Sequence, residues 1–297
     1  MEGLLAALGH EIQDADEGKS TEHIHFDLRR SRSRRVINLG MVDPKAEELD
    51  LCIAGRDFTI KQSPGVLQSK REGGTTGAAV WRACVVFAEW IATPKNCLFQ
   101  HGLLEPNSVA IELGSGISGL VPSVLSLRVK RILATDQQYA LKLLQENIAT
   151  NRPVSKGRSS SQKASKANWG AGNIELAALD WETDDIAAFL RRYGLEDGVD
   201  VVMACDCIYN YALIDPLVQT CVDVCKARSA CKVSNQTPPK PSMCIIAQQL
   251  RQPDVFEQWL EMFLVHFRVW RVPDKMLTEA LREGSGFVLH IGVLRER

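Results

Sequence analysis

A glycine-rich turn between two apolar segments constrains the fold of this chain more than any other feature. In the stretch IELGSGISG, Gly114, Gly116 and Gly119 follow an apolar run and precede a helix-like segment. Glycines at this spacing allow a tight turn and close approach of the backbone to a ligand, with a helix N-terminus behind them. Asp136 ends the next apolar run, where its carboxylate can accept hydrogen bonds from both hydroxyls of a ribose. The pattern therefore predicts a site for an adenosine-bearing cofactor.

The charge beside this turn separates two kinds of cofactor. Glu112 lies two residues before the first glycine, and it would repel the dianionic pyrophosphate of NAD. S-adenosyl-L-methionine has no phosphate and carries a sulfonium and an ammonium group, which an acidic side chain attracts. The chain also shows no second mononucleotide-binding half. We therefore favour S-adenosyl-L-methionine. An NAD-dependent dehydrogenase is the alternative, as is a Glu112 that only caps a backbone amide.

From Ser108 onward, apolar runs alternate with amphipathic segments. Such alternation predicts an α/β fold with a mostly parallel sheet and helices on both faces. The expected strands are SVAIEL, RILAT, IELAALDW, VDVVMACD and MCIIAQQL, and the expected helices are GLVPSVLSLR, YALKLLQENIAT and segments near residues 184–193, 213–226 and 255–265. Two closing runs, FRVWRV and GFVLHIGVL, have no clear helix between them. They predict an antiparallel hairpin at one edge of the sheet.

The chain ahead of the glycine turn predicts a different arrangement. Residues 51–64 read as a β-hairpin that turns at residues 54–57. GGTTGAAVWRACVVFAEWI predicts a loop that leads into an amphipathic helix with Trp81 in its first turn. We expect residues 1–45 to form a partly flexible extension and residues 46–297 to form one domain. The basic run from Arg29 to Arg35 is either a solvated linker or a nuclear address or docking patch.

Composition limits the partners of the chain. The net charge of −1 gives no global attraction to nucleic acid or to an anionic membrane, and no apolar run reaches the roughly 18–20 residues of a membrane span. The nine cysteines include no C-x-x-C pair. We therefore expect no metal site and reduced thiols, which are typical of the cytosol or nucleus.

Two basic segments interrupt the alternation. Residues 152–172 and 227–242 predict flexible insertions. Each connects a helix to the next strand, so both should lie at the N-terminal edge of the sheet, opposite the edge at which α/β sheets bind ligands. A supplementary grip on an anionic partner is the alternative.

Six segments carry a resemblance to a known family. In chain order, TGAAVW, FAEWI, ELGSGISGL, ATD, LDW and CDCIYN resemble the seven-β-strand protein-lysine methyltransferases of the methyltransferase-16 group. The resemblance spans roughly Leu51 to the C-terminus, and T-G-A-x-x-W combined with D-x-x-Y is specific to the group. It implies a seven-stranded Rossmann-like class I methyltransferase sheet, preceded by the N-terminal β-hairpin, and S-adenosyl-L-methionine as cofactor.

The resemblance also implies roles at the cofactor site. Besides Glu112, the expected cofactor-binding residues are Trp81, Gly114, Ser115, Gly116, Asp136, Trp181 and Cys205. The three loop residues would line the methionine part, and Asp136 would bind the ribose. Trp181 would pack on the adenine, Cys205 would close the pocket, and Trp81 would lie over the cofactor. For both tryptophans, packing in the core is the alternative.

The D-x-x-Y motif supplies the candidate catalytic residues. Asp206 and Tyr209 would lie on one side if a helical turn follows the strand. Asp206 would orient a lysine ammonium, and Tyr209 would hydrogen-bond it and limit the number of methyl groups that fit. The alternative for Asp206 is an N-cap of the next helix. Asn210 is a weaker candidate of the same kind.

These residues predict a protein-lysine N-methyltransferase. The resemblance implies a lysine of a large-subunit (60S) ribosomal protein such as protein L1 as its target. A small-molecule N-methyltransferase and a non-catalytic methyltransferase-like binding module are the alternatives. We expect a monomer in the cytoplasm, and also in the nucleus, with a protein substrate, no membrane and no direct nucleic-acid binding.

Overall fold

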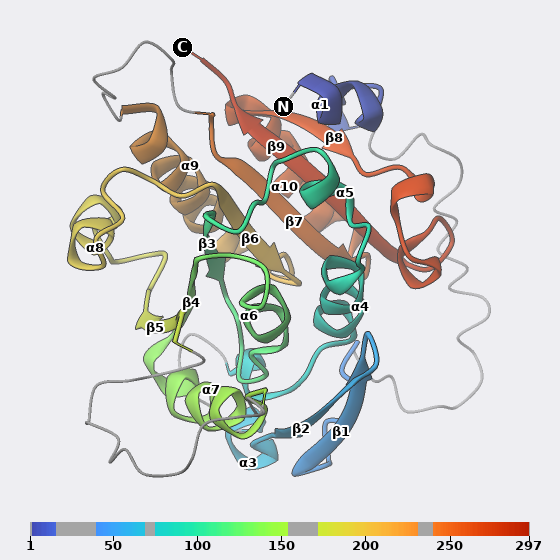
Figure 1. Cartoon of the computed structure of the whole chain (residues 1–297), viewed down its shortest axis with the longest axis vertical. Helices are drawn as coiled ribbons and strands as arrows, with labels where there is room; N and C mark the ends of the chain where they lie inside the picture. Colours follow the sequence, from blue (N-terminus) through green and yellow to red (C-terminus); the bar gives the residue numbers. More distant parts are fainter. Residues whose placement is uncertain (1, 16–39, 69–74, 154–171, 231–239, 297) are drawn as a thin grey trace.

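The computed structural model describes residues 2–15, 40–68, 75–153, 172–230 and 240–296 (Figure 1). The basic run of residues 29–35 and most of the two expected insertions lie outside these ranges. No helix in the described ranges is long and apolar enough to cross a membrane.

A seven-stranded sheet forms the centre of the molecule (Figure 1). Its strands are β3 (Val109–Leu113), β4 (Arg131–Asp136), β5 (Ile174–Ala178), β6 (Val201–Cys205), β7 (Met243–Gln249), β8 (Phe267–Arg271) and β9 (Phe287–Leu294). They lie in the order β5-β4-β3-β6-β7-β9-β8. The first five are parallel, whereas β9 runs antiparallel to both of its neighbours, β7 and β8. This order confirms the predicted Rossmann-like sheet with an antiparallel C-terminal edge.

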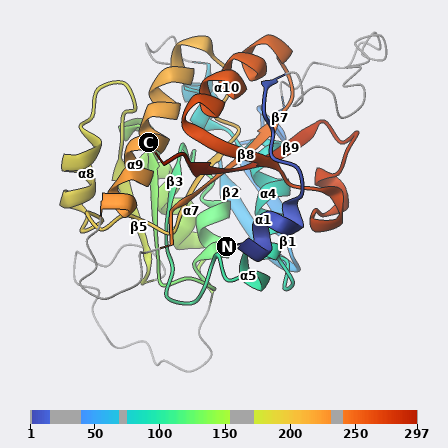
Figure 2. The same ribbon diagram turned by 90° about the horizontal axis from the view of Figure 1, so that it is seen from above.

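Helices cover both faces of the sheet. One face carries α4 (Arg82–Ala92), α6 (Leu120–Leu125) and α7 (Gln138–Thr150), and the other carries α8 (Ile186–Arg192), α9 (Ile214–Ala230) and α10 (Pro253–His266). Figure 2 shows α8 and α9 on one side and α4 on the other. Alternate residues of the central strands enter separate apolar clusters, as with Ala110 and Ile111 of β3. Burial on both faces explains why these strands read as continuous apolar runs.

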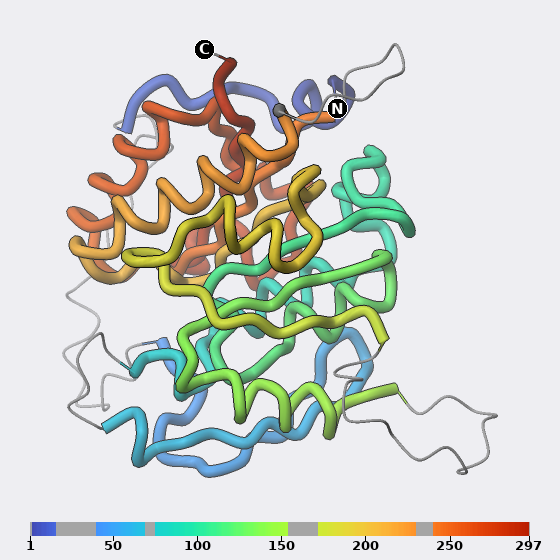
Figure 3. The backbone as a smooth tube through the Cα atoms, turned by 90° about the vertical axis from the view of Figure 1, so that its left-hand side faces the viewer, coloured from blue at the N-terminus to red at the C-terminus, as the bar shows by residue number. Residues whose placement is uncertain are grey.

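A hairpin of β1 (Glu48–Ile53) and β2 (Arg56–Lys61) precedes the sheet, as predicted, although its turn is shorter and consists of Ala54 and Gly55. Figure 3 shows it at the end of the molecule opposite α1. The side chains of Asn147 in α7 and of Asn151, which directly follows α7, pair with the outer edge of the hairpin. Asn147 exchanges hydrogen bonds with the backbone of Lys61, and Asn151 does so with Thr59. Each asparagine amide satisfies both the N–H and the C=O of one residue of β2, as a neighbouring strand would. These hydrogen bonds attach the hairpin to the domain.

Parts of the expected N-terminal extension pack on the domain. In α1 (Glu2–Leu8), Leu4 and Leu8 are buried, and Ile12 forms a bridge with Val269 of β8. Met41 forms a second bridge with Trp81, which the structure places directly before α4 rather than in its first turn. Shorter helices complete the chain: α3 (Pro64–Leu67), α5 (Cys97–Gln100) and 3₁₀ turns at Thr76–Ala78, Tyr211–Leu213, Asp274–Met276 and Glu279–Leu281.

Candidate active site

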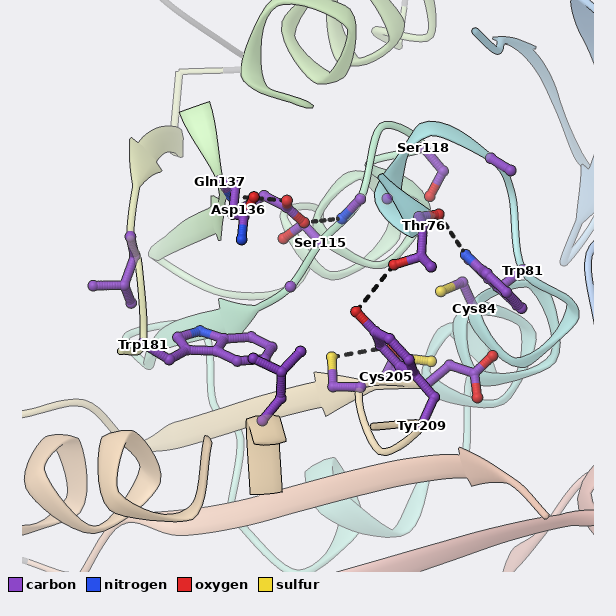
Figure 4. A pocket seen from close by; sticks show the side chains of 18 of the residues that line it. Thr76, Trp81, Cys84, Ser115, Ser118, Asp136, Gln137, Trp181, Cys205 and Tyr209 are labelled. Atoms are coloured by element: carbon purple, nitrogen blue, oxygen red, sulfur yellow. Dashed lines mark hydrogen bonds between the residues drawn. The ribbon is translucent and has the colours of Figure 1, made fainter. Parts of the chain in front are cut away.

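A cavity opens at the carboxyl ends of β3, β4 and β6; together with the solvent space at its mouth it measures about 790 Å³ (Figure 4). The chain turns back across the sheet between β3 and β6, and such a switch point is where open α/β sheets bind ligands. The cavity is lined by Thr76, Gly77, Ala79, Trp81 and Cys84, by Gly114, Ser115, Gly116 and Ser118, by Asp136, Gln137 and Tyr139, by Leu179, Asp180, Trp181 and Glu182, and by Cys205, Asp206, Cys207, Tyr209 and Leu213.

The glycine loop forms the floor of this cavity. Gly114 has φ +69°, and a Cβ there would lie 2.7 Å from Cys207 Sγ and 3.3 Å from the ring of Trp181. Gly116 N donates a 2.7 Å hydrogen bond to Asp136 Oδ2, and Gln137 N donates to Oδ1 at 2.8 Å. Burial raises the pKa of Asp136 to about 6, against these two hydrogen bonds, which lower it. The glycine loop is therefore hydrogen-bonded directly to Asp136, the residue expected to bind the ribose.

The segment before α4 closes over the loop from the other side. Ile117 N donates to the carbonyl of Gly77 at 2.9 Å, and Gly77 N donates to the Tyr139 hydroxyl at 3.1 Å. A Cβ at Gly77 would come within 2.8 Å of that hydroxyl oxygen. The T-G-A segment is thus the second wall of the cavity, packed directly on the glycine loop.

Glu112 lies behind the cavity and is not among its lining residues. It is 2% exposed and accepts a 2.6 Å hydrogen bond from the hydroxyl of Ser115. Burial raises the pKa of Glu112 to about 7, the Ser115 hydroxyl lowers it in part, and the charge of Asp136 raises it further. Glu112 therefore does not face the cavity, and Ser115, which does line it, connects the two.

Two tryptophans face each other across the cavity. Figure 4 shows Trp181 on one side and Trp81 on the other. The Trp81 indole N–H donates to the carbonyl of Thr76 at 2.9 Å, and the Trp181 ring lies against the glycine loop. Cys205 also lines the cavity at the end of β6. The structure thus brings together every expected cofactor residue except Glu112.

Asp206 and Tyr209 both line the cavity, but no helical turn separates them. The next 3₁₀ turn starts at Tyr211, and Asn210, not Asp206, is its N-cap and accepts from Ala212 N at 3.1 Å. Thr76 Oγ1 donates to the Tyr209 hydroxyl at 3.0 Å. Burial raises the pKa of Tyr209, so that the phenol stays protonated near neutral pH.

The charge of the cavity decides what it can hold. Four carboxylates line it, those of Asp136, Asp180, Glu182 and Asp206, while no lysine, arginine or histidine does so in the part of the chain that the structure describes. A pyrophosphate would meet only negative charge there, whereas a sulfonium or an ammonium would be attracted. Two facing indoles and a glycine floor leave room for a flat base. The residues present therefore fit S-adenosyl-L-methionine and not NAD.

Some lining residues were not expected from the sequence. Thr76, Gly77, Cys84 and Cys207 belong to the segments TGAAVW, RACVV and CDCIYN, and their proximity to recognised motifs was the available signal. Arg251 had no such signal. It lies just after β7, yet its guanidinium contacts Asp206. The described residues, those of the cavity included, contain no group of three or more histidine, cysteine or acidic side chains suited to a metal ion.

Comparison with known proteins assigns this arrangement to a family. A family model described as lysine methyltransferase matches residues 61–241, more than half of the chain. The chain belongs to the lysine methyltransferase family. This membership confirms the resemblance to the methyltransferase-16 group, and with it an enzyme that uses S-adenosyl-L-methionine as methyl donor.

Fungal proteins of this family cover most of the chain. Ribosomal lysine N-methyltransferase 5 of Zygosaccharomyces rouxii is 28% identical over 239 residues, which are 72% of each chain. The protein of the same name from Vanderwaltozyma polyspora is 27% identical over 304 residues, 86% of this chain and 90% of that protein. The motif resemblance to lysine methyltransferases thus extends to the sequence as a whole.

A third relative carries a different name. A Schizosaccharomyces pombe protein named diaminohydroxyphosphoribosylamino-pyrimidine deaminase is 29% identical over 259 residues, 87% of this chain but 54% of that protein. This chain therefore spans about half the length of that relative. The H-x-E and P-C-x-x-C signature of zinc nucleobase deaminases does not occur in the sequence of this chain. The name describes the longer protein.

Among solved structures, an rRNA methylase from Streptococcus thermophilus aligns with a TM-score of 0.39 and 12% identity, covering 72% of this chain and 98% of that one. At this level of similarity, the fold assignment rests on the strand order described above.

Proposed function

We propose that this chain is a protein-lysine N-methyltransferase that modifies a large-subunit (60S) ribosomal protein, such as protein L1. Lysine methyl transfer follows from the family, whereas the ribosomal target is our inference. The observation that carries the chemistry is the acid-lined cavity, in which Asp206 and Tyr209 lie at the end of β6 beside the glycine loop.

The cofactor would lie along the carboxyl edge of the sheet. Its ribose hydroxyls would bind Asp136, and its adenine would pack on the ring of Trp181. The amino-acid part would lie over Gly114 and Gly116. Both have positive φ, and a Cβ at Gly114 would come within 2.7 Å of Cys207 Sγ. When bound, S-adenosyl-L-methionine supplies an electrophilic methyl group on a sulfonium. Trp81 and Thr76 close the opposite wall and exclude water.

The substrate lysine must lose a proton before it can react. An ordinary lysine has a pKa of about 10.4, so only around one in a thousand is neutral near pH 7.4, which corresponds to roughly 4 kcal/mol. Entry into a cavity walled by Trp81 and Tyr209 lowers this cost through desolvation. Burial raises the pKa of Asp206, which makes its carboxylate a better proton acceptor than an exposed aspartate. Tyr209, which stays protonated, orients the nitrogen.

The ribosomal target is supported by the names of the fungal relatives, which align over most of this chain. We also propose that the enzyme acts as a monomer in the cytoplasm and in the nucleus. Asp206, Asp136 and the glycine loop are all present, which favours catalysis over a binding module without activity.

Mass spectrometry of ribosomal proteins tests the target. Ribosomes from cells with the wild-type chain should carry a methylated lysine on one large-subunit protein, and ribosomes from cells with Asp206→Ala should carry the unmodified residue. An unchanged set of methylated lysines would rule out this ribosomal substrate. Label that appears only in small molecules, after incubation of extract with radiolabelled methyl donor, would support the small-molecule alternative.

A further inference from the structure

The backbone of Asp206 is held in an unusual conformation. Its φ of +60° lies in the left-handed region, which residues other than glycine seldom adopt and which is concentrated at functional sites. Asp206 N donates a 2.8 Å hydrogen bond to the carbonyl of Ala247 in β7. The neighbouring strand thus fixes the turn that aims this carboxylate.

The two oxygens of the Asp206 carboxylate have different surroundings. Oδ1 accepts from Arg251 Nη2 at 2.5 Å, from Gln248 Nε2 at 3.2 Å and from Gln249 N at 3.3 Å. Oδ2 is buried and has no hydrogen-bond partner in the described parts of the chain. The side chain is 1% exposed, so bulk water does not compensate this oxygen. A buried acceptor without a donor indicates a place for a ligand that donates.

Arg251 is itself held on several sides. Its guanidinium lies 4.8 Å from the centre of the Trp81 ring, and its Nη1 donates to Gln249 Oε1 at 3.1 Å. The backbone at Gly40 passes so close that a Cβ there would lie 2.2 Å from Nη1. Arg251 does not line the cavity. It contacts two residues that do, Asp206 and Trp81.

We propose that Arg251 is a positioning residue that occupies Asp206 Oδ1, so that Oδ2 alone accepts one N–H of the substrate lysine ammonium. The proposal rests on the proposed lysine methyltransferase function and adds a reason why the cavity selects lysine side chains over arginine side chains. A guanidinium binds a carboxylate best through two parallel hydrogen bonds, which need both oxygens. An ammonium needs only one. The occupied Oδ1 therefore favours lysine over arginine in this cavity.

Arg251 also controls the charge of this group. Burial raises the pKa of Asp206, and the charge and hydrogen bond of Arg251 lower it again in part. Among the described residues, Cys205, Cys207 and Tyr209 are close enough to be affected by the charge of Asp206. Burial raises their pKa values and this charge raises them further, so the three groups stay neutral near pH 7. Loss of Arg251 should therefore raise the pKa of Asp206 without a compensating charge.

A matched pair of variants tests the proposal. Arg268 has the same kind of surroundings away from the cavity: it donates to Glu11 Oε2 at 2.7 Å and lies 5.0 Å from the centre of the Trp270 ring. Initial rates would be measured from about pH 6 to pH 9 with large-subunit ribosomal proteins and tritiated S-adenosyl-L-methionine. Arg251→Met should lower kcat/KM about a hundredfold at neutral pH. It should also move the acidic limb of the profile to higher pH, whereas Arg268→Met should match the wild type.

Further variants separate positioning from folding. Arg251→Lys, which keeps the charge, should restore the acidic limb toward its wild-type position. The double variant Asp206→Asn with Arg251→Met should be no slower than Asp206→Asn alone, because both act through one carboxylate. Calorimetry with S-adenosylhomocysteine should show wild-type affinity for Arg251→Met, and this result excludes unfolding. Glu112 and Asp136 also titrate in this pH range. A shift of the acidic limb therefore supports the proposal only if Arg251→Met shows it and Arg268→Met does not.

Three outcomes would overturn the proposal. If Arg251→Met keeps the wild-type pH profile, or if its losses add to those of Asp206→Asn, then Arg251 does not act through Asp206. If the wild-type enzyme labels no ribosomal protein but does label lysine in other proteins, the ribosomal target fails, and the variants are compared on the labelled protein. If it labels no lysine at all, both proposals fail.

Discussion

Thr76 Oγ1 donates a 3.0 Å hydrogen bond to the Tyr209 hydroxyl and so joins the loop before α4 to the loop after β6 (Figure 4). Tyr209→Phe removes this hydroxyl and should lower kcat/KM roughly tenfold, about 1.4 kcal/mol of transition-state stabilisation. Thr76→Val removes the donor to the Tyr209 hydroxyl but keeps that hydroxyl, and should lower kcat/KM less. The exposed Tyr211 is the control, because Tyr211→Phe should retain full activity. Equal rates for Tyr209→Phe and the wild type would exclude the hydroxyl from the reaction.

The bond between Gly116 N and Asp136 predicts a pH dependence of cofactor binding. If the ribose needs the ionised carboxylate, affinity for S-adenosylhomocysteine should fall as the pH drops through about 6, the pKa to which burial raises Asp136. Asp136→Asn should weaken binding by about 2 kcal/mol, roughly thirtyfold, at pH 8 and should lose this pH dependence. Calorimetry at several pH values measures both effects. Asp223→Asn, at a partly exposed position on α9, should bind like the wild type. Binding to Asp136→Asn with wild-type affinity would exclude a ribose contact.

Alanine variants of Gly114 and Gly194 distinguish the effect of backbone strain from the effect of lost space in the cofactor cavity. Their φ values are +69° and +62°, so the backbone strain of alanine should destabilise the fold by about 1 kcal/mol at either position, and the contact with Cys207 should add to this at Gly114. No described atom beyond the immediate chain neighbours lies within 4 Å of a Cβ at Gly194, whereas a Cβ at Gly114 meets Cys207 Sγ. Only Gly114→Ala should therefore lose affinity for S-adenosylhomocysteine. Similar affinities for the two variants would show that the loop has space to spare.

The ionised form of Glu112 should destabilise the folded protein at high pH. Burial raises its pKa from 4.5 to about 7, so its contribution to stability is full below pH 4.5 and is lost as the pH rises through 7. Glu112→Gln should therefore stabilise the protein by about 3 kcal/mol at pH 8, and by less than about 1 kcal/mol at pH 5. Urea unfolding at the two pH values measures the difference. A stability change that is the same at both would mean that Glu112 is not protonated in this range.

Much of the fold could be predicted because each element carries its own pattern. The apolar runs that end at Leu113, Asp136 and Cys205 are strands buried on both faces, and parallel strands bring such ends to one edge. Asp136 and the glycine loop therefore meet as expected. The Trp81 position was harder to predict, because its backbone pairs with Met41 and stays extended where a helical period alone would continue the helix.

The remainder of the site depends on contacts that no local pattern contains. The segment after Asp206 is irregular and not helical, and Gln248 of the neighbouring strand accepts from Ile208 N and donates to its carbonyl. Arg251 reaches Asp206 only because β7 lies beside β6. Each of these depends on the position of a second element.

The most direct test of the account is amino-acid analysis of the reaction product. The full-length chain would be incubated with tritiated S-adenosyl-L-methionine and large-subunit ribosomal proteins, and the labelled protein would be hydrolysed and separated. We predict that the label elutes as N-methylated lysine and that Asp206→Asn reduces it at least a hundredfold. Label in methylarginine, label confined to small molecules, or equal labelling by Asp206→Asn would contradict the account.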